Sequence, residues 1–213
     1  YEKVQTYPFG QYFIEMFRSI ERIMNEVKDL GDIKLVNTTL KELRYGLKVF
    51  EQYAQNPIIS IFGSARTPAK APEYQTALQF SKAMAQRGYM IITGAGNGIM
   101  QAGHEGAGKE NSIGLNIYLP FEQVPNPVIA GDPKLITFKY FYTRKLFFLK
   151  YIQASVFLPG GLGTQDEAFE TLTLLQTSKQ PPIPVILLDK TKGRYWHFWQ
   201  TFIRKQFYDQ GYV

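Results

Sequence analysis

From residue 57 onward, short apolar runs alternate along the chain with longer segments that have helical spacing. The apolar runs contain the β-branched and aromatic residues that buried strands favour, and they cover residues 58–62, 89–93, 113–118, 135–138, 154–158 and 184–188. Helices are predicted between and after them, over residues 72–87, 97–109, 140–153, 167–177 and 195–208. Strands that alternate with helices form parallel sheets, so we predict the α/β class: a Rossmann-like doubly wound parallel sheet with helices on both faces.

The first 56 residues have a different pattern, which predicts a helical extension. Residues 11–30 have the spacing of an amphipathic helix, and Gly31 is expected to end it. A second helix is expected next, with a narrow apolar seam of Val36, Leu40, Leu43, Leu47 and Phe50. Such a seam packs one helix against another, either within the chain or across a dimer. We therefore predict two domains, a helical extension at residues 1–56 and the sheet domain at residues 57–213.

Glycine-rich loops follow several of the predicted strands. They cover residues 63–67, 94–100 and 159–167, with the sequences GSART, GAGNGIM and PGGLGTQDE. In a doubly wound sheet, ligands bind beyond the carboxyl ends of the strands, where these loops would meet. Glycine also lets an anion approach the backbone closely. We interpret the loops together as the walls of a nucleotide-sized pocket lined by backbone N–H groups.

The last of these loops has two interpretations. Gly160, Gly161 and Gly163 lie between a predicted strand and a helix start, where N–H groups and the helix dipole favour an anion. The structural alternative is that Thr164 and Glu167 form a capping box and the glycines only turn the chain. For this loop taken alone, the sequence leaves both interpretations open. The other glycine loops favour the pocket.

Composition and spacing exclude several kinds of site. The chain has no cysteine and only two histidines, so disulfides and thiolate metal sites are excluded, and we predict no metal. We also predict no cofactor. Gly94, Gly96 and Gly98 depart from the dinucleotide fingerprint, and Lys109 is followed by Glu110 rather than by the Ser or Thr of a P-loop. NAD binding and ATP hydrolysis are therefore disfavoured.

Charge and hydropathy bear on partners and location. The net charge of +6 suits an anionic ligand, but the basic residues are spread along the chain, so nucleic acid is not expected as a partner. No apolar run approaches the length of a membrane span and no signal-peptide pattern opens the sequence. We therefore expect a cytoplasmic protein with no membrane partner.

A combination of motifs carries a family resemblance. The motifs are Gly63-Ser64, Gly94-Ala95-Gly96-Asn97-Gly98-Ile99-Met100, Tyr142-Thr143-Arg144-Lys145 and Pro159-Gly160-Gly161-Leu162-Gly163-Thr164-Gln165-Asp166-Glu167. Together they resemble the LONELY GUY family of cytokinin riboside 5′-monophosphate phosphoribohydrolases and related nucleotide nucleosidases. Residues 112–117, with Phe121-Glu122-Gln123 and Pro127, resemble the longer bacterial members, whose N-terminal helices residues 1–56 would match. Members are often labelled lysine decarboxylases, but no motif here resembles a pyridoxal-phosphate site.

The resemblance implies hydrolysis of a nucleoside 5′-monophosphate to free base and ribose 5-phosphate by a catalytic domain at residues 57–213. Glu167 would stabilise the positive charge that develops on the ribose and would activate the water. Arg144 would orient the substrate or assist the departing base. Phosphate would bind Gly160, Gly161, Gly163 and Thr164. The remaining nucleotide contacts would come from Gly63, Ser64, Arg66, Gly94, Gly96, Asn97, Gly98, Met100 and Lys145. The resemblance also implies a homodimer or a higher homo-oligomer.

Other interpretations stay open at this point. By spacing alone, Arg144 and Lys145 suit a solvated helix face, although the aromatic residues around them indicate a buried helix whose arginine needs an anionic partner. A carrier that holds a nucleotide or molybdenum cofactor would need the amide cradle but no carboxylate at the sugar. A nucleic-acid-binding protein would need a localised basic face.

Overall fold

The computed structural model describes residues 4, 6–120 and 124–213. The motif segment Phe121-Glu122-Gln123 therefore lies outside the described residues. The chain divides into two compact units, Tyr1–Arg44 and Tyr45–Val213. The second unit thus begins before residue 57, where the sequence pattern places the domain boundary.

The first unit is helical. Helix α2 covers Gly10–Glu26, and helix α3 covers Leu30–Glu51 and so continues into the second unit. The prediction that Gly31 ends a helix is wrong, because the break comes at Val27, whose backbone is extended. The Asp29 carboxylate then accepts a hydrogen bond from the Asp32 N–H at 3.0 Å, as an N-cap does. Gly31 consequently lies in the first turn of α3.

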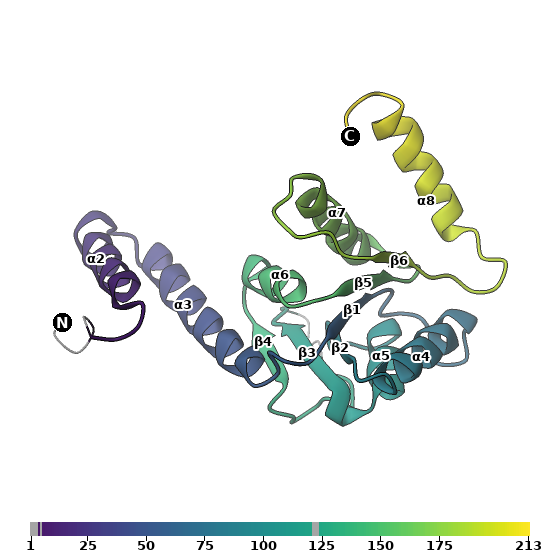
Figure 1. Cartoon of the computed structure of the whole chain (residues 1–213), viewed down its shortest axis with the longest axis horizontal. Coiled ribbons are helices and arrows are strands. Elements are labelled where there is room, and N and C mark those ends of the chain that lie inside the picture. Colours follow the sequence, from purple (N-terminus) through teal and green to yellow (C-terminus); the bar gives the residue numbers. More distant parts are fainter. Residues whose placement is uncertain (1–3, 5, 121–123) are drawn as a thin grey trace. The chain divides into compact units, whose positions relative to one another are not determined.

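A six-stranded sheet organises the second unit (Figure 1). Its strands are β1 (Ile58–Phe62), β2 (Met90–Thr93), β3 (Ser112–Ile117), β4 (Leu135–Phe138), β5 (Ala154–Phe157) and β6 (Val185–Leu187). All neighbours are parallel, in the order β4-β3-β2-β1-β5-β6. The chain moves outward from β1 to β4 and then crosses to the other side of β1. This reversal creates a switch point between β1 and β5, where doubly wound sheets bind ligands.

Helices cover both faces of this sheet. Helices α4 (Pro72–Ala85) and α5 (Ile99–Ala107) lie on one side, and α6 (Phe141–Lys150) and α7 (Leu162–Gln176) lie on the other (Figure 1). A short 3₁₀ turn, Lys109–Asn111, precedes β3, and helix α8 (Tyr195–Ile203) continues as a π-helical segment, Arg204–Tyr208. The predicted fold class is confirmed. No helix in the described part of the chain is long and apolar enough to span a bilayer.

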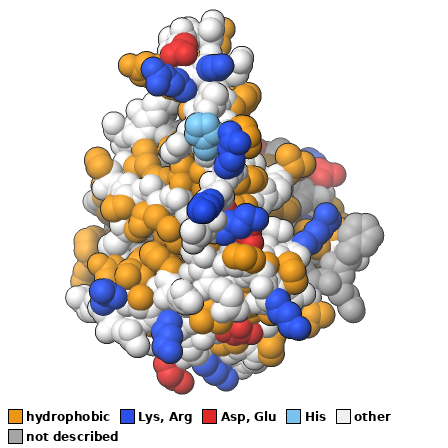
Figure 2. All heavy atoms as spheres, turned by 90° about the vertical axis from the view of Figure 1, so that its right-hand side faces the viewer, with side chains coloured by type: hydrophobic (Ala, Val, Ile, Leu, Met, Phe, Trp, Pro, Cys, Tyr) orange, Lys and Arg blue, Asp and Glu red, His pale blue; other side chains and the backbone are white. Residues whose placement is uncertain are grey.

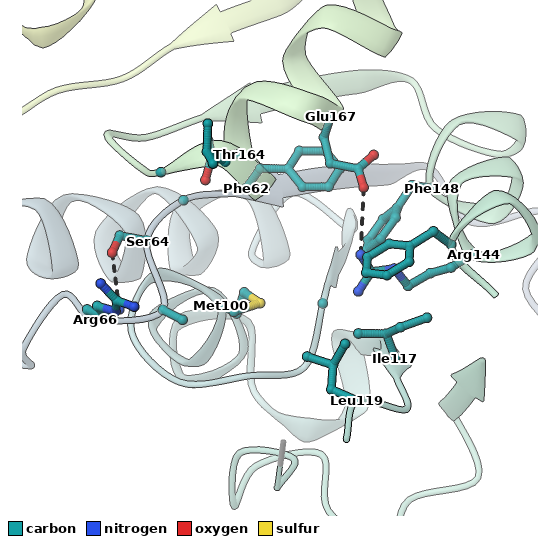
Figure 3. A pocket seen from close by; sticks show the side chains of 17 residues that line it. Phe62, Ser64, Arg66, Met100, Ile117, Leu119, Arg144, Phe148, Thr164 and Glu167 are labelled. Atoms are coloured by element: carbon teal, nitrogen blue, oxygen red, sulfur yellow. Dashed lines mark hydrogen bonds and ion pairs between the residues drawn. The ribbon is translucent and has the colours of Figure 1, made fainter. Parts of the chain in front are cut away.

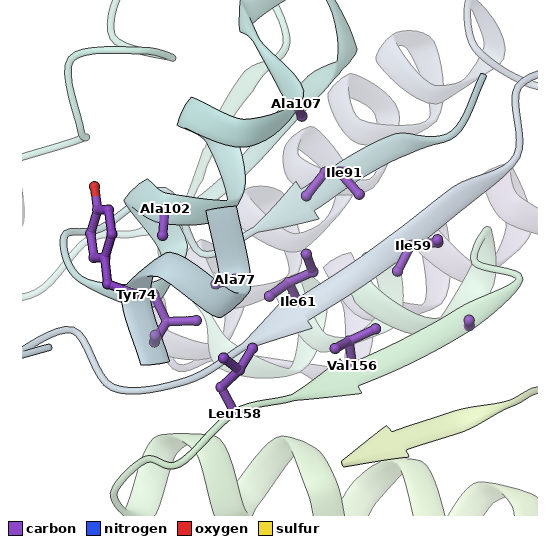
Figure 4. Close-up of a cluster of buried hydrophobic side chains, with 11 residues drawn as sticks. Ile59, Ile61, Tyr74, Ala77, Ile91, Ala102, Ala107, Val156 and Leu158 are labelled. Carbon is purple, nitrogen blue, oxygen red and sulfur yellow. The ribbon is translucent and has the colours of Figure 1, made fainter. Parts of the chain in front are cut away.

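The alternation of side chains along each strand builds a separate core on each face. Ile59 and Ile61 of β1 point toward α4 and α5, where they meet Ile91, Val156 and the small residues Ala77 and Ala102 (Figure 4). Phe62 points the other way and packs against Phe148 of α6, with ring centroids 4.9 Å apart. Both cores hold the carboxyl ends of β1 and β5 in fixed register.

Candidate active site

A cavity of about 550 Å³ opens at the carboxyl ends of β1 and β5, on the switch point of the sheet (Figure 3). The glycine loops contribute much of its wall, and its lining comprises Phe62, Gly63, Ser64, Ala65, Arg66, Gly94, Met100, Ile117, Leu119, Phe141, Arg144, Phe148, Gly161, Leu162, Gly163, Thr164 and Glu167. The Ser64 N–H donates to the Pro159 carbonyl at 3.1 Å, which joins the loops that follow β1 and β5. The predicted pocket therefore exists where these loops meet.

The start of α7 forms one end of the cavity. The N–H groups of Thr164 and Gln165 turn back to the Gly161 carbonyl, at 3.0 and 3.1 Å. The N–H groups of Leu162 and Gly163 have no hydrogen-bond partner within the described residues. A Cβ added to Gly161 or Gly163 would meet no protein atom within 4 Å, so the space beside both glycines is open. This end suits an anion such as a phosphate.

The capping-box alternative is not formed. Helix α7 begins at Leu162 after Gly161 and has no side-chain cap, so Thr164 is already inside the first turn. Its hydroxyl packs against Gly160, where an added Cβ would lie only 2.1 Å from the oxygen. Glu167 points into the cavity, toward Arg144 (Figure 3). The sequence pattern predicts that the helix begins at residue 167, but it begins at Leu162. Thr164 is therefore too far into the helix to cap it.

Glu167 and Arg144 meet on the opposite side of the cavity from Ser64, Arg66 and Thr164 (Figure 3). Arg144 Nη2 lies 3.8 Å from Glu167 Oε1, and the two side chains are only 12% and 4% exposed. The guanidinium is held beside the rings of Phe141 and Phe148, at 5.0 and 5.5 Å from their centroids. The sequence prediction that this buried arginine has an anionic partner agrees with this geometry.

Each member of the pair has an unused polar atom. Glu167 Oε2 and Arg144 Nε are buried and have no hydrogen-bond partner among the described residues. A buried acceptor and a buried donor without hydrogen-bond partners each cost free energy. Both atoms belong to residues that line the cavity, so a bound ligand could satisfy them.

Burial tunes the acid–base behaviour of this pair. Desolvation raises the pKa of Glu167 to about 7, although the charge of Arg144 opposes the shift. Burial also lowers the pKa of Arg144, but a guanidinium stays protonated at neutral pH. Glu167 can therefore gain and lose a proton near pH 7, as a general acid or base must. No cluster of His, Asp and Glu that could hold a metal lies within the described ranges.

Lys145 lies outside the cavity, although its neighbour Arg144 lines it. Its ammonium pairs with Asp166 at 2.9 Å and with Glu170 on α7. These contacts fasten α6 to α7. These ion pairs join the helices that carry Arg144 and Glu167, and the nucleotide contact of Lys145 stays a prediction.

The loop after β2 is divided between the cavity and the scaffold. Gly94 and Met100 line the cavity, whereas Gly96, Asn97 and Gly98 do not. Gly98 has a φ of +63°, and an added Cβ would lie 2.3 Å from the Ser64 carbonyl oxygen. Gly98 thus lets two loops approach each other. Gly160 lines a smaller adjoining cavity of about 350 Å³, together with Ser64 and Arg66.

Two buried residues that no sequence pattern marked hold this loop in place. The side chain of Asn126, 1% exposed, donates to the carbonyls of Ala95 and Gly96 at 3.0 and 3.1 Å. His104 Nε2 lies 3.1 Å from the Ile113 carbonyl and Nδ1 lies 3.1 Å from Asn126 Nδ2. Burial lowers the pKa of His104 to about 4, so the ring is neutral. The only sequence signal was the position of Asn126 between two prolines.

We expect Asn126→Ala to destabilise the protein by about 1 to 3 kcal/mol, because it leaves the buried Gly96 carbonyl without its donor and removes one of the two donors to the Ala95 carbonyl. Denaturant unfolding measures this loss. Asn56→Ala, at an exposed position, is the control and should change the free energy of unfolding by less than about 0.5 kcal/mol. Equal stability of both variants would contradict the role of Asn126 as a clamp.

The fold and the cavity define the class of protein: a Rossmann-like α/β protein with a ligand-sized cavity at the switch point of its sheet. A family model described as "possible lysine decarboxylase" matches residues 94–213, which is more than half of the chain. The chain therefore belongs to this family, which is the LONELY GUY type that its motifs resemble. The matched residues include Arg144 and all of α7.

Several solved structures are similar to this chain at low sequence identity. The structural-genomics target TM1055 is 23% identical, with a TM-score of 0.49 over 68% of this chain and 81% of that chain. The molybdenum cofactor binding protein from the phototrophic bacterium Rippkaea orientalis is 20% identical, with a TM-score of 0.47 over 71% and 84%. The Moco carrier protein from Chlamydomonas reinhardtii is 22% identical, with a TM-score of 0.45 over 74% and 87%. A comparison with curated proteins found no match.

Proposed function

We propose that this protein hydrolyses the N-glycosidic bond of a nucleoside 5′-monophosphate, releasing the free base and ribose 5-phosphate. One observation carries the proposal: a single cavity holds unpartnered helix N–H groups at one end and a buried carboxylate–guanidinium pair at the other. The first feature suits a phosphate, and the second suits the bond between sugar and base. In a nucleoside 5′-monophosphate, the phosphate is attached to one end of the ribose, at C5′, and the bond to the base is at the other end, at C1′.

Cleavage of this bond needs a stabilised positive charge and an activated water. As the bond from C1′ to the base nitrogen breaks, its electron pair leaves with the base and the ribose gains oxocarbenium character. A Glu167 carboxylate beside C1′ would stabilise that charge and take a proton from the attacking water, whose oxygen bonds to C1′. A pKa near 7 lets the resulting acid return the proton to the departing base. Arg144 would hydrogen-bond to the base or orient the sugar.

The remaining lining residues fit the other parts of the ligand. We assign the phosphate to the N–H groups of Gly161, Leu162 and Gly163, with the Thr164 hydroxyl beside them. Apolar side chains near Arg144 would contact the base, and they are Met100, Ile117, Leu119 and Phe141. Lysine is absent from the described lining, so no side chain there could form the Schiff base of a pyridoxal-phosphate decarboxylase.

The distribution of charge on one face of the molecule bears on the choice between a small ligand and nucleic acid. On the face shown in Figure 2, the Lys and Arg side chains are interspersed with hydrophobic ones. A protein that binds nucleic acid electrostatically gathers basic side chains along one face. The net charge of +6 therefore favours anionic ligands in general without building such a face in this view.

The direct test is incubation with a panel of nucleoside 5′-monophosphates, with free base and ribose 5-phosphate as the products measured. We expect release from at least one purine monophosphate. Tight binding of a nucleotide or of molybdenum cofactor with no release of base would instead indicate the carrier function. Binding of oligonucleotides that weakens steeply with salt, together with inertness toward mononucleotides, would indicate nucleic-acid binding.

Alanine at Gly161 or Gly163 tests the phosphate end separately. We expect each variant to weaken binding of ribose 5-phosphate about tenfold, because a methyl group would occupy space now open beside the N–H groups. Neither variant meets a protein atom, so the free energy of unfolding should not fall. Calorimetric titration and denaturant unfolding measure the two quantities. Unchanged affinity in both variants would place the phosphate elsewhere.

A further inference from the structure

We propose that Tyr195 is a positioning residue for the phosphate end of the cavity, a role that rests on the proposed function. Its hydroxyl donates to the Gly160 carbonyl at 2.6 Å and accepts from Gln165 Nε2 at 2.6 Å. Trp199 Nε1 then donates to Gln165 Oε1, also at 2.6 Å. A chain of hydrogen bonds therefore runs from Trp199 of α8 to Gln165 of α7, and from there through Tyr195 of α8 to Gly160 in the loop after β5.

The bond to Gly160 controls an N–H group at the cavity. The Gly160 carbonyl and the Gly161 N–H belong to one planar trans peptide, in which they point in opposite directions. When Tyr195 holds the carbonyl on its own side, the Gly161 N–H is directed away from Tyr195. That N–H has no hydrogen-bond partner within the described part of the chain, and Gly161 lines the cavity.

This peptide needs an external lock because glycine flanks it on both sides. Two successive glycines leave the backbone free to rotate, and no side chain of their own restricts the peptide. The Gly161 N–H could then turn away from a bound phosphate at little energetic cost. The Tyr195 hydroxyl fixes the peptide before a ligand arrives, and preorganised donors bind more tightly than donors that must reorient.

Tyr195 is the first residue of α8, and the segment that follows β6 holds it in place. Its backbone N–H donates to the Asp189 carboxylate at 3.1 Å, which fixes the start of α8. The adjacent Trp196 is 5% exposed, and its Nε1 donates to the Leu188 carbonyl at 2.6 Å. The sheet therefore sets the position of Tyr195, and Tyr195 sets the orientation of the Gly160–Gly161 peptide.

The test compares Tyr195→Phe with wild type in the full chain. The ring can keep its contact with Trp196, so the variant removes the hydroxyl alone. We expect the Kd of ribose 5-phosphate and the KM of the best nucleotide to rise about five- to tenfold, the worth of about one hydrogen bond. We expect kcat to change by less than about twofold, because Glu167 and Arg144 are untouched. Inhibition by free adenine, which lacks a phosphate, should not change.

Two further variants separate positioning from general stability. Gln165→Met keeps the hydroxyl that donates to Gly160 and should weaken ribose 5-phosphate binding less than Tyr195→Phe does. Tyr208→Phe removes an exposed hydroxyl and should bind like wild type. Wild-type affinity for ribose 5-phosphate in Tyr195→Phe, or equal weakening of ribose 5-phosphate and adenine, would overturn the role of Tyr195. A wild type that binds no ribose 5-phosphate would instead overturn the proposed function.

Discussion

Glu167→Gln is expected to lower kcat at least about a hundredfold while leaving nucleotide binding nearly intact. Glutamine keeps the size of the side chain and its place against Arg144, but it can neither take a proton nor carry the negative charge that would stabilise an oxocarbenium ion. Loss of a positioned acid or base lowers rates by about 10² to 10⁴. Initial rates of base release and calorimetric titration with the same nucleotide measure the two effects.

Arg144→Met is the companion to this experiment. It removes the positive charge that lowers the pKa of Glu167, so the carboxyl should stay protonated to higher pH. The pH profile of kcat/KM should therefore shift to higher pH. The residual kcat/KM of Glu167→Gln should lack the pH dependence that the titration of Glu167 causes in the wild type. Turnover that survives Glu167→Gln would exclude the carboxylate from the chemistry and favour the carrier function.

Much of the fold could be predicted from the sequence because its information is local. Short β-branched runs that alternate with helical patterns, several of them followed by a glycine turn, define the strands of a parallel sheet, and parallel sheets place their carboxyl ends at one edge. The glycine loops, Arg144 and Glu167 could be brought to one cavity by that argument together with the family motifs. The helix start was misplaced, because spacing alone does not show that Leu162 and Gly163 already lie in the first turn.

The supporting residues could not be predicted, because their roles come from contacts between segments distant in sequence. Asn126 reaches the loop after β2 from a proline-rich connection, and Tyr195 reaches Gly160 from the last helix. Neither contact has a periodic or local signature. Lys145 also shows what local motifs leave out: its motif position predicts a ligand contact, whereas its ion pairs with Asp166 and Glu170 depend on the packing of α6 against α7.

The stability of the unliganded wild type should fall as pH rises from about 4.5 to about 7, relative to Glu167→Gln. The pKa of Glu167 is raised from 4.5 to about 7 by burial, so the folded state holds a proton that the unfolded state has released across this range. A group with a raised folded pKa stabilises the fold at low pH, and this contribution is lost as pH rises through the folded pKa. The full shift of the Glu167 pKa corresponds to about 3 kcal/mol in the free energy of unfolding.

Denaturant unfolding of both proteins at about pH 5 and about pH 8 measures the effect. We expect the difference in free energy of unfolding, variant minus wild type, to grow by about 2 to 3 kcal/mol between these values, and to be nearly constant above about pH 8. Glu110→Gln, which removes an exposed carboxylate, is the control for the loss of one negative charge. A difference that stays constant across the range would mean that Glu167 is ionised at low pH in the folded protein. The charge of Arg144 would then lower the pKa of Glu167 by as much as desolvation raises it. Glu167 could still stabilise positive charge as a carboxylate, but it would not carry a proton near neutral pH.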